Sequence, residues 1–505
     1  MSAIKQIKFG ALLSYFSIMI NIIAMLLYTP WMINKIGQSQ YGLYTLANSL
    51  ITLFVVDLGL SAATTRYLSK YRAENKKEEA EKFLSAIYQL YLILDGIVII
   101  ILVSLFFFID SMYTKLSPTE LHQFKVVYII SALFCVINFP FITLNGILTA
   151  YEKFVLLKLC DVIYRLLNIS ITIIALACGH GLYALVSIHA FVAILMIIVK
   201  LIIIKHSIPI KLRFYAVNIK LYREILSFSL WVTISMIAQR LIFSITPTIL
   251  GAVANTAAIA IFGIIVSIES YCYIITNAID GMFIPRISHL MTERTVSSKL
   301  THLLLRVGKF QCALNGLIVV GFAVLGKEFI ELWVGDAYLP AYAGTLFILI
   351  PGIFINSLMI ANATVVVLKK VNISAEIMLA TGIINVVLSV LLAKKWGVLG
   401  ACASIGLAYF IRAILYFIIY HKILPINIVI FIKKCFLKMS TPIIFIAVGG
   451  YFLNNIAIHT SWLLLFLKAI IIGGVYLFTI FIWGLDQEER NYIVNLIKHK
   501  KTNLL

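Results

Sequence analysis

Charged side chains stand inside stretches of the sequence that are otherwise apolar and long enough to cross a membrane. Arg240 lies in the middle of 231–251, and Glu269 lies in the apolar segment that follows. A charge at the centre of a bilayer costs roughly 3 kcal/mol on insertion scales, so it normally faces a partner or a wet cavity. An arginine stays charged and can bind phosphate with two parallel hydrogen bonds. We therefore expect Arg240 to bind an anionic ligand, with an internal ion pair to Glu269 as the alternative.

Three other titratable groups in apolar segments are candidates for proton or ion exchange. A carboxyl group at the depth of Glu269 needs either a cation or a proton, so it could couple transport to an ion. The alternative is a neutral or paired structural carboxyl. Asp95 and His189 are weaker candidates of the same kind, and a hydrogen-bonded interior histidine is the more common situation for His189.

Further charges fall near the ends of apolar segments, where each has a structural alternative. Arg412 could line a cytoplasmic vestibule or reach out to the inner headgroups. Asp57 could contribute to a ligand path or brace a helix end, and Arg66 lies at the membrane boundary. Asp161 and Arg165 are four residues apart and share a helix face, which favours a structural ion pair.

Uncharged residues complete the candidate site. Gln239, Asn21 and Tyr15 add polar groups to the segments that contain them. Pro30 and Pro247 follow threonines at matching places, and a proline can either bend or end a helix. They are hinge candidates, with helix termination as the alternative.

Metal, cofactor and covalent chemistry are not indicated. The seven cysteines are scattered without metal-type spacing, so we expect neither a metal site nor a cofactor. A phosphate-binding loop of the Walker type is missing from the sequence, which argues against direct ATP hydrolysis.

The composition is that of a membrane protein. Hydrophobic residues make up 62% of the 505 residues and charged residues only 12%, against about 25% charged in soluble domains. We predict an all-α polytopic fold with about 14 transmembrane helices. The expected spans are 12–33, 42–63, 83–109, 124–148, 159–178, 182–204, 227–250, 256–280, 303–325, 341–367, 373–393, 397–420, 437–457 and 462–483.

The basic residues predict the orientation. With the N-terminus inside, 27 Lys and Arg residues fall in cytoplasmic connections and 5 fall in the opposite ones. This positive-inside asymmetry places both termini in the cytoplasm. It also accounts for the net charge of +20 without nucleic-acid binding, because basic loops contact anionic membrane lipids.

Weak internal similarity suggests two parallel repeats. Thr29-Pro30 and Asn168 match Thr246-Pro247 and Asn385 at a common shift of 217 residues. We therefore expect two six-helix bundles, 1–204 and 227–420, related by a parallel pseudo-two-fold axis. A basic cytoplasmic linker, 205–226, joins them, and 421–505 adds two helices and a cytoplasmic tail.

One N-terminal stretch carries a family resemblance. Residues 26–83 contain Gly37, Tyr41-Gly42-Leu43-Tyr44, Asp57-Leu58-Gly59-Leu60 and Arg66-Tyr67 before a basic-acidic loop. This pattern resembles Wzx-type polysaccharide (O-antigen) flippases, a branch of the multidrug/oligosaccharidyl-lipid/polysaccharide exporter superfamily. The predicted organisation extends the resemblance to the whole chain.

The resemblance implies a transporter and not an enzyme. Such proteins move undecaprenyl-diphosphate-linked oligosaccharides to the outer leaflet of the bacterial inner membrane by alternating access. It implies a lipid-linked oligosaccharide as cargo and a glycan polymerase and chain-length regulator as further partners. Two alternatives within the superfamily stay open, a lipid II flippase and a multidrug or cation antiporter, and a membrane glycan enzyme would need a larger outer loop. The charge of Arg240 favours an anionic cargo over a cationic one.

Overall fold

The computed structural model describes most of the chain, and every regular element in the described residues is a helix. The described residues are 19, 22–24, 26–54, 57–209, 215, 219–277, 287, 290, 296–368, 370–424, 428–454, 461–487 and 489–491. Nine helices among them are long and apolar enough to cross a membrane. The all-α polytopic class is therefore confirmed, while the number fourteen stays a prediction.

The chain forms two compact units. Unit 1 contains the described residues of Met1–Ile264 and Ala375–Ser404, and unit 2 contains those of Ile265–Ser374 and Ile405–Leu505. Two long helices, α11 (Thr256–Asn277) and α16 (Val371–Ile423), contribute residues to both units. The expected division into bundles around a linker at 205–226 stays a prediction.

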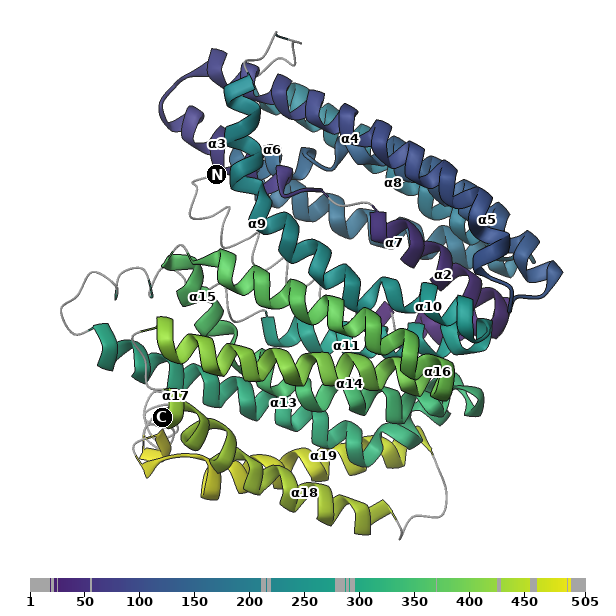
Figure 1. Ribbon diagram of the computed structural model, residues 1–505. Helices are drawn as coiled ribbons and strands as arrows, with labels where there is room; N and C mark the ends of the chain where they lie inside the picture. Colours follow the sequence, from purple (N-terminus) through teal and green to yellow (C-terminus); the bar gives the residue numbers. More distant parts are fainter. Residues whose placement is uncertain are drawn as a thin grey trace, which may run out of the picture. The chain divides into compact units, whose positions relative to one another are not determined.

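In unit 1, some helices pack on their neighbours in the sequence and others on helices that are distant in the sequence. The helices are α2 (Gln38–Phe54), α3 (Leu60–Ala73), α4 (Lys77–Met112), α5 (Pro118–Asn138), α6 (Leu144–Ala150), α7 (Phe154–Ala177), α8 (Leu182–Ser207), α9 (Ile219–Phe243) and α10 (Ile245–Val253), with the 3₁₀ turn η1 (Phe139–Phe141). Helix α5 packs against α2, α4 and α8, and α10 packs against α2 (Figure 1).

The expected second span, 42–63, is broken into α2 and α3. Leu58 and Gly59 both have positive φ, 48° and 67°, which an uninterrupted helix cannot contain. The Asp57 carboxylate accepts the Ser61 backbone N–H at 3.3 Å and a hydrogen bond from the Tyr91 hydroxyl. The family-like motif thus forms an elbow in which Asp57 braces the start of α3.

The expected seventh span is also interrupted. A turn at Ser244 separates α9 from α10, three residues before Pro247. Proline removes a backbone donor and crowds the carbonyl four residues earlier, which accounts for a break at this place. The chain continues as a helix beyond Pro247, and 26–36 is helical around Pro30. Neither proline ends its helix, and their hinge role stays a prediction.

Unit 2 is organised around the long helix α13 (Val296–Val334). The other elements are η3 (Asp336–Tyr338), α14 (Pro340–Ser357), α15 (Met359–Val367), α17 (Ile428–Phe431), η4 (Ile432–Leu437), α18 (Lys438–Asn454), α19 (Trp462–Thr479) and η5 (Ile480–Gly484). Helices α14, α18 and α19 all pack on α13. Gly316 makes this approach possible, because a Cβ there would lie 2.3 Å from the Tyr476 hydroxyl.

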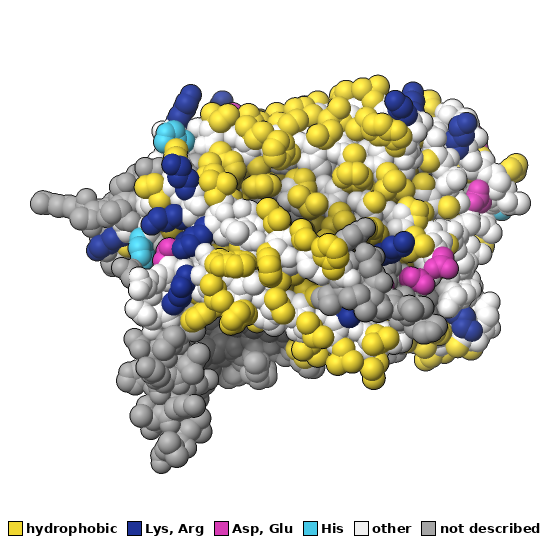
Figure 2. Space-filling model, turned by 90° about the horizontal axis from the view of Figure 1, so that it is seen from below, with side chains coloured by type: hydrophobic (Ala, Val, Ile, Leu, Met, Phe, Trp, Pro, Cys, Tyr) yellow, Lys and Arg dark blue, Asp and Glu magenta, His cyan; other side chains and the backbone are white. Residues whose placement is uncertain are grey.

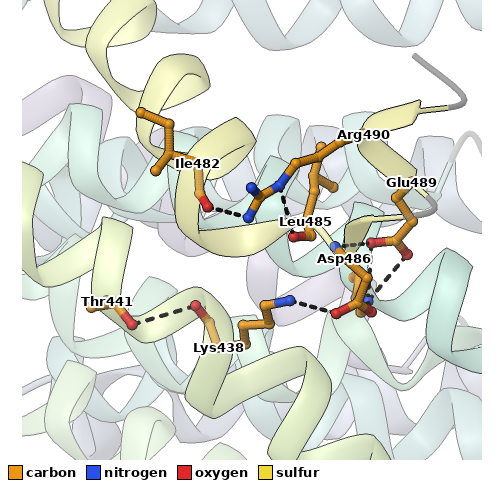
Figure 3. Close-up of polar contacts among 8 residues, drawn as sticks. Lys438, Thr441, Ile482, Leu485, Asp486, Glu489 and Arg490 are labelled. Carbon is orange, nitrogen blue, oxygen red and sulfur yellow. Dashed lines mark hydrogen bonds and ion pairs between the residues drawn. The ribbon is translucent and has the colours of Figure 1, made fainter. Parts of the chain in front are cut away.

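Ion pairs hold α13 to the C-terminal part of the chain at two places. Lys309, of which only 4% is exposed, contacts Asp486 and lies 3.1 Å from a Glu489 oxygen. Lys438 also contacts Asp486, and Arg490 donates to the Leu485 and Ile482 carbonyls (Figure 3). Farther along α13, Glu328 pairs with Lys468 of α19 at 2.7 Å.

The surface of these helices suits a lipid environment. Helix α19 exposes Leu463, Phe466 and Ile470, each by more than half of its area. Figure 2 shows one face of the molecule largely covered by hydrophobic side chains, with Lys and Arg gathered toward its ends. Apolar side chains between charged ends are what a bilayer and its headgroups require.

The ion cluster predicts a stability difference between two lysines. Lys309→Met leaves carboxylates without a buried partner, so we expect the free energy of unfolding to fall by about 2 kcal/mol. The control is Lys82→Met, which removes the exposed pair with Glu78 and should have a clearly smaller effect, because solvent screens exposed ion pairs. Thermal denaturation in detergent measures both, and equal effects would contradict the prediction.

The same cluster predicts a pH dependence. Burial opposes ionisation of Asp486, but the hydrogen bonds and charges of Lys309 and Lys438 outweigh it and lower the pKa of this carboxyl from 3.8 to about 2. A depressed folded-state pKa stabilises the protein above about pH 4, and the contribution is lost as the pH falls through about 2. We therefore expect the melting temperature to drop less between pH 4 and pH 2 in Asp486→Asn than in the unaltered protein. An equal drop would show that this carboxyl does not contribute.

Candidate functional site

A polar cavity lies inside unit 1, among α2, α5, α8 and α9. Its volume is about 190 Å³. Its lining consists of Tyr44, Asn48, Ile51, Thr52, Ser131, Phe134, Cys135, Asn138, Val186, His189, Ala190 and Arg240. The cavity therefore brings together Arg240 and His189, which lie 51 positions apart in the sequence and were assigned different roles there.

The lining is suited to a negatively charged ligand. Arg240 is half-buried, and its guanidinium makes no hydrogen bond or ion pair with a described residue of unit 1. No lining residue is acidic. The hydroxyls and amides of Tyr44, Asn48 and Asn138 can donate hydrogen bonds beside the guanidinium. A cation at this depth without a partner in unit 1 is suited to binding an anion.

Hydrogen bonds fix the ring of His189. The Tyr164 hydroxyl lies 2.9 Å from Nδ1, and the Asn168 side-chain nitrogen lies 3.4 Å from the same atom. Phe134 and Tyr164 both meet the ring edge-on. The histidine is thus held between α7 and the cavity, as expected for an interior histidine with hydrogen-bond partners. Its role in ion exchange stays a prediction.

Arg165 is a second cation beside this site, and the expected pair with Asp161 is wrong. Asp161 lies 3.4 Å from Lys158 and 3.9 Å from Lys200 instead, because these two lysines reach it from its own helix and from α8. Arg165 is half-buried and has no ion pair with a described residue. It lies within electrostatic reach of His189 and Tyr44. The cavity therefore has an arginine in its wall and another nearby.

Other predicted site residues of unit 1 lie outside the lining. Asp57 is engaged in the elbow described above, and Arg66 is exposed with its guanidinium 5.9 Å from the Tyr67 ring centroid. Gln239 precedes Arg240 but is not part of the lining. Asp95 is buried near the lining residue Cys135, and its Oδ1 has no hydrogen-bond partner among the described residues.

The remaining candidates belong to unit 2 or cannot be placed. Glu269 is half-buried in α11, and its pairing with Arg240 stays a prediction because the two residues belong to different units. Arg412 is buried with its guanidinium 5.4 Å from the Tyr409 ring centroid. Tyr15 and Asn21 lie outside the described residues.

The sequence interpretation missed the neutral polar lining. Tyr44, Asn48 and Thr52 recur every four residues along α2, and Ser131 and Asn138 are seven apart on α5. Residues at these spacings share one face of a helix. A search for polar stripes at helical spacing would have found this lining, whereas a search for charges alone could not.

The chain is similar to proteins of known families. The family model described as "Polysaccharide biosynthesis protein" matches residues 8–291. A protein from Shigella flexneri described as "Putative O-antigen transporter" is 23% identical over 388 residues, 75% of this chain and 89% of the relative.

Solved structures of low sequence identity share the fold. A lipid II flippase, MurJ, in an inward closed conformation matches with a TM-score of 0.68 at 16% identity, covering 92% of this chain and 97% of the other. A multidrug resistance MATE family transporter of the MOP superfamily, in an inward-facing conformation, gives 0.64 at 15% identity, with 81% and 98% covered. The all-helical transporter fold expected from the sequence is confirmed.

We predict that Arg165 and Asp161, which are neighbours on α7, affect anion binding differently. Inorganic pyrophosphate, titrated calorimetrically into the purified protein, serves as the anionic probe. Arg165→Gln should weaken its binding about tenfold, since a hydrogen bond or close contact with a charged group contributes about 1.5 kcal/mol. Asp161→Asn, one helical turn away, should leave binding unchanged. Similar losses in both variants would contradict a separate role of Arg165 in anion binding.

Proposed function

Because the chain belongs to the polysaccharide biosynthesis protein family, we propose that it is a flippase for oligosaccharides linked to a lipid through a diphosphate. The protein is a multi-pass membrane transporter of the polysaccharide exporter type and not an enzyme. The proposed cargo is an undecaprenyl-diphosphate-linked repeat unit of an O-antigen or capsule. Transport would run from the cytoplasmic to the outer leaflet of a bacterial inner membrane, with both termini in the cytoplasm.

The observation that supports this proposal is the Arg240 cavity. A lipid-linked sugar carries an anionic diphosphate next to a polar glycan, and both must pass through the low-dielectric interior. The cavity supplies a guanidinium, a second arginine nearby and several neutral donors, without an acidic residue in its lining. A cationic drug would require the opposite charge, so the lining disfavours the cation-antiporter alternative.

The size of the cavity indicates which part of the cargo it holds. Its volume of about 190 Å³ is below the roughly 300–1,000 Å³ of sites that enclose drug-sized ligands. We assign the diphosphate to this cavity, with the glycan and the lipid tail outside it. An arginine can bind two phosphate oxygens in parallel, which fixes the orientation of the cargo as well as its charge.

Ion coupling and protein partners are further parts of the proposal. Asp95 and His189 in unit 1 and Glu269 in unit 2 are the candidates for carrying a coupling proton or cation. Asp95 and His189 lie near or in the cavity, so a change in their charge would act on a bound diphosphate. A glycan polymerase and a chain-length regulator would receive the cargo at the outer leaflet.

Arg240 predicts the transport phenotype. Arg240→Ala should abolish surface-glycan export in a deletion strain and leave lipid-linked oligosaccharide in the inner leaflet, because the diphosphate loses its buried counter-charge. Arg240→Lys keeps the charge but not the bidentate geometry and should restore export only in part. Surface glycan and the leaflet distribution of lipid-linked sugars are the measurements.

The matched control is Arg223→Ala, because Arg223 is an exposed arginine on the same helix α9. It should export normally at equal protein level in the membrane. Full complementation by Arg240→Ala would exclude the assigned role of the cavity. Accumulation of lipid II in place of a lipid-linked repeat unit would assign the protein to the alternative flippase class.

A further inference from the structure

One carboxylate joins three segments of unit 1 that are distant in the sequence. Glu120 Oε1 accepts hydrogen bonds from the Ser39 hydroxyl at 2.6 Å and from the Thr256 hydroxyl at 2.7 Å. Its Oε2 accepts from the Ser117 backbone N–H at 3.0 Å, within the capping box of α5. The beginnings of α2, α5 and α11 are therefore held together by charge-assisted hydrogen bonds. We call Ser39, Glu120 and Thr256 the outer latch.

Glycines let the helix backbones approach one another around the outer latch. A Cβ on Gly42 would lie 2.2 Å from the Thr256 carbonyl oxygen, and one on Gly251 would lie 2.9 Å from the Tyr113 ring. A Cβ on Gly263 would lie 3.0 Å from the Thr45 hydroxyl. These distances show that α2 packs closely against α10 and the start of α11 around the outer latch.

The outer latch lies at the predicted extracytoplasmic end of unit 1. Its three residues belong to or border the connections that carry few basic residues, whereas the turn between α3 and α4 at the opposite end contains Arg72, Lys76 and Lys77. The positive-inside asymmetry assigns the latter end to the cytoplasm. The latch also joins segments from both expected six-helix bundles, since Thr256 begins the eighth predicted span.

The helices that carry the outer latch also line the cavity. Along α2, Ser39 precedes the lining residue Asn48 by nine positions, about 14 Å at 1.5 Å per residue. Along α5, Glu120 precedes the lining residue Ser131 by eleven positions, about 17 Å. Because a helix moves as a rigid rod over such lengths, separation of the latch residues would displace the cavity wall.

We propose that the outer latch is an extracytoplasmic gate, closed in this structure, whose release opens the Arg240 cavity to the outside. The proposal uses transport by alternating access but not the identity of the cargo. The two proposals can therefore fail separately. The labelling experiment below tests the gate through the access of a water-soluble reagent to the cavity. The proposed function is tested through the lipid-linked sugars that accumulate.

Native Cys135 provides the probe, because it is buried in the cavity lining. In a variant that retains only this cysteine, a small membrane-impermeant thiol reagent is added to intact cells. Thr256→Val removes one latch hydrogen bond at constant shape, and Gly42→Ala introduces a methyl group against the Thr256 carbonyl. Thr256→Val should raise the rate of Cys135 labelling about tenfold, as expected for the loss of one charge-assisted hydrogen bond. Gly42→Ala should also raise it, because the added methyl group pushes α2 and the start of α11 apart.

Matched controls separate gating from general loosening. Thr119→Val removes an exposed hydroxyl close to Glu120, and Gly96→Ala adds a methyl group in α4 where nothing lies within 4 Å. Both should label as slowly as the parent variant. Equal labelling of the latch variants and the controls would overturn the proposal.

A cross-link tests whether the latch must open during transport. The Ser39 and Thr256 hydroxyls both lie within 2.7 Å of the same Glu120 oxygen, so Ser39→Cys combined with Thr256→Cys should form a disulfide on oxidation. Oxidised cells should lose export and regain it after reduction, whereas each single variant should be insensitive to oxidation. Export that persists with the disulfide formed would show a permanent structural contact and would overturn the proposal.

Discussion

The structure depends on how charges are accommodated in a low-dielectric interior. A buried ion without a partner costs several kcal/mol, and several such groups among the described residues are engaged. Lys309 has Asp486 and Glu489, Lys468 has Glu328, and the Asp57 carboxylate receives two hydrogen bonds. In contrast, Arg240 lines a cavity and has no partner among the described residues of unit 1. Its guanidinium is therefore available to a ligand from the side of unit 1.

The kind of polar contact also differs between segments that are held firmly and segments that can separate. In unit 2, the ion pairs at Lys309 and Lys468 hold the C-terminal part of the chain to α13 at two places, which favours movement of these segments as one body. In unit 1, a single carboxylate, Glu120, holds three segments through hydroxyl groups. A hydrogen bond to a charged group contributes about 1.5–3 kcal/mol, whereas breaking a buried ion pair costs about 3–5 kcal/mol. The second arrangement is thus the one better suited to opening and closing.

The sequence predicted the fold class and part of the site. Apolar length and basic asymmetry were sufficient for the all-α membrane class, because burial in lipid imposes them on each span separately. The depth of Arg240 was sufficient to predict a cavity. The helix break at 57–59 was not predicted, since hydropathy does not register two residues with positive φ, whereas Pro247 did point to an irregularity near Ser244. The partners of Asp161 could not be predicted either, because Lys200 approaches from another helix.

The two interrupted spans meet at α9, the helix that carries Arg240. The elbow at Gly59 contacts α9 closely, since a Cβ there would lie 3.2 Å from the Ser229 carbonyl oxygen. Arg240 follows eleven positions later on the same helix, and the turn at Ser244 comes four residues after it. At that turn Ser244 keeps helical dihedral angles, and its N–H donates to the Arg240 carbonyl at 2.9 Å. The backbone that carries Arg240 is thus braced by a contact on one side and by a helical hydrogen bond on the other, which holds the guanidinium at the cavity wall.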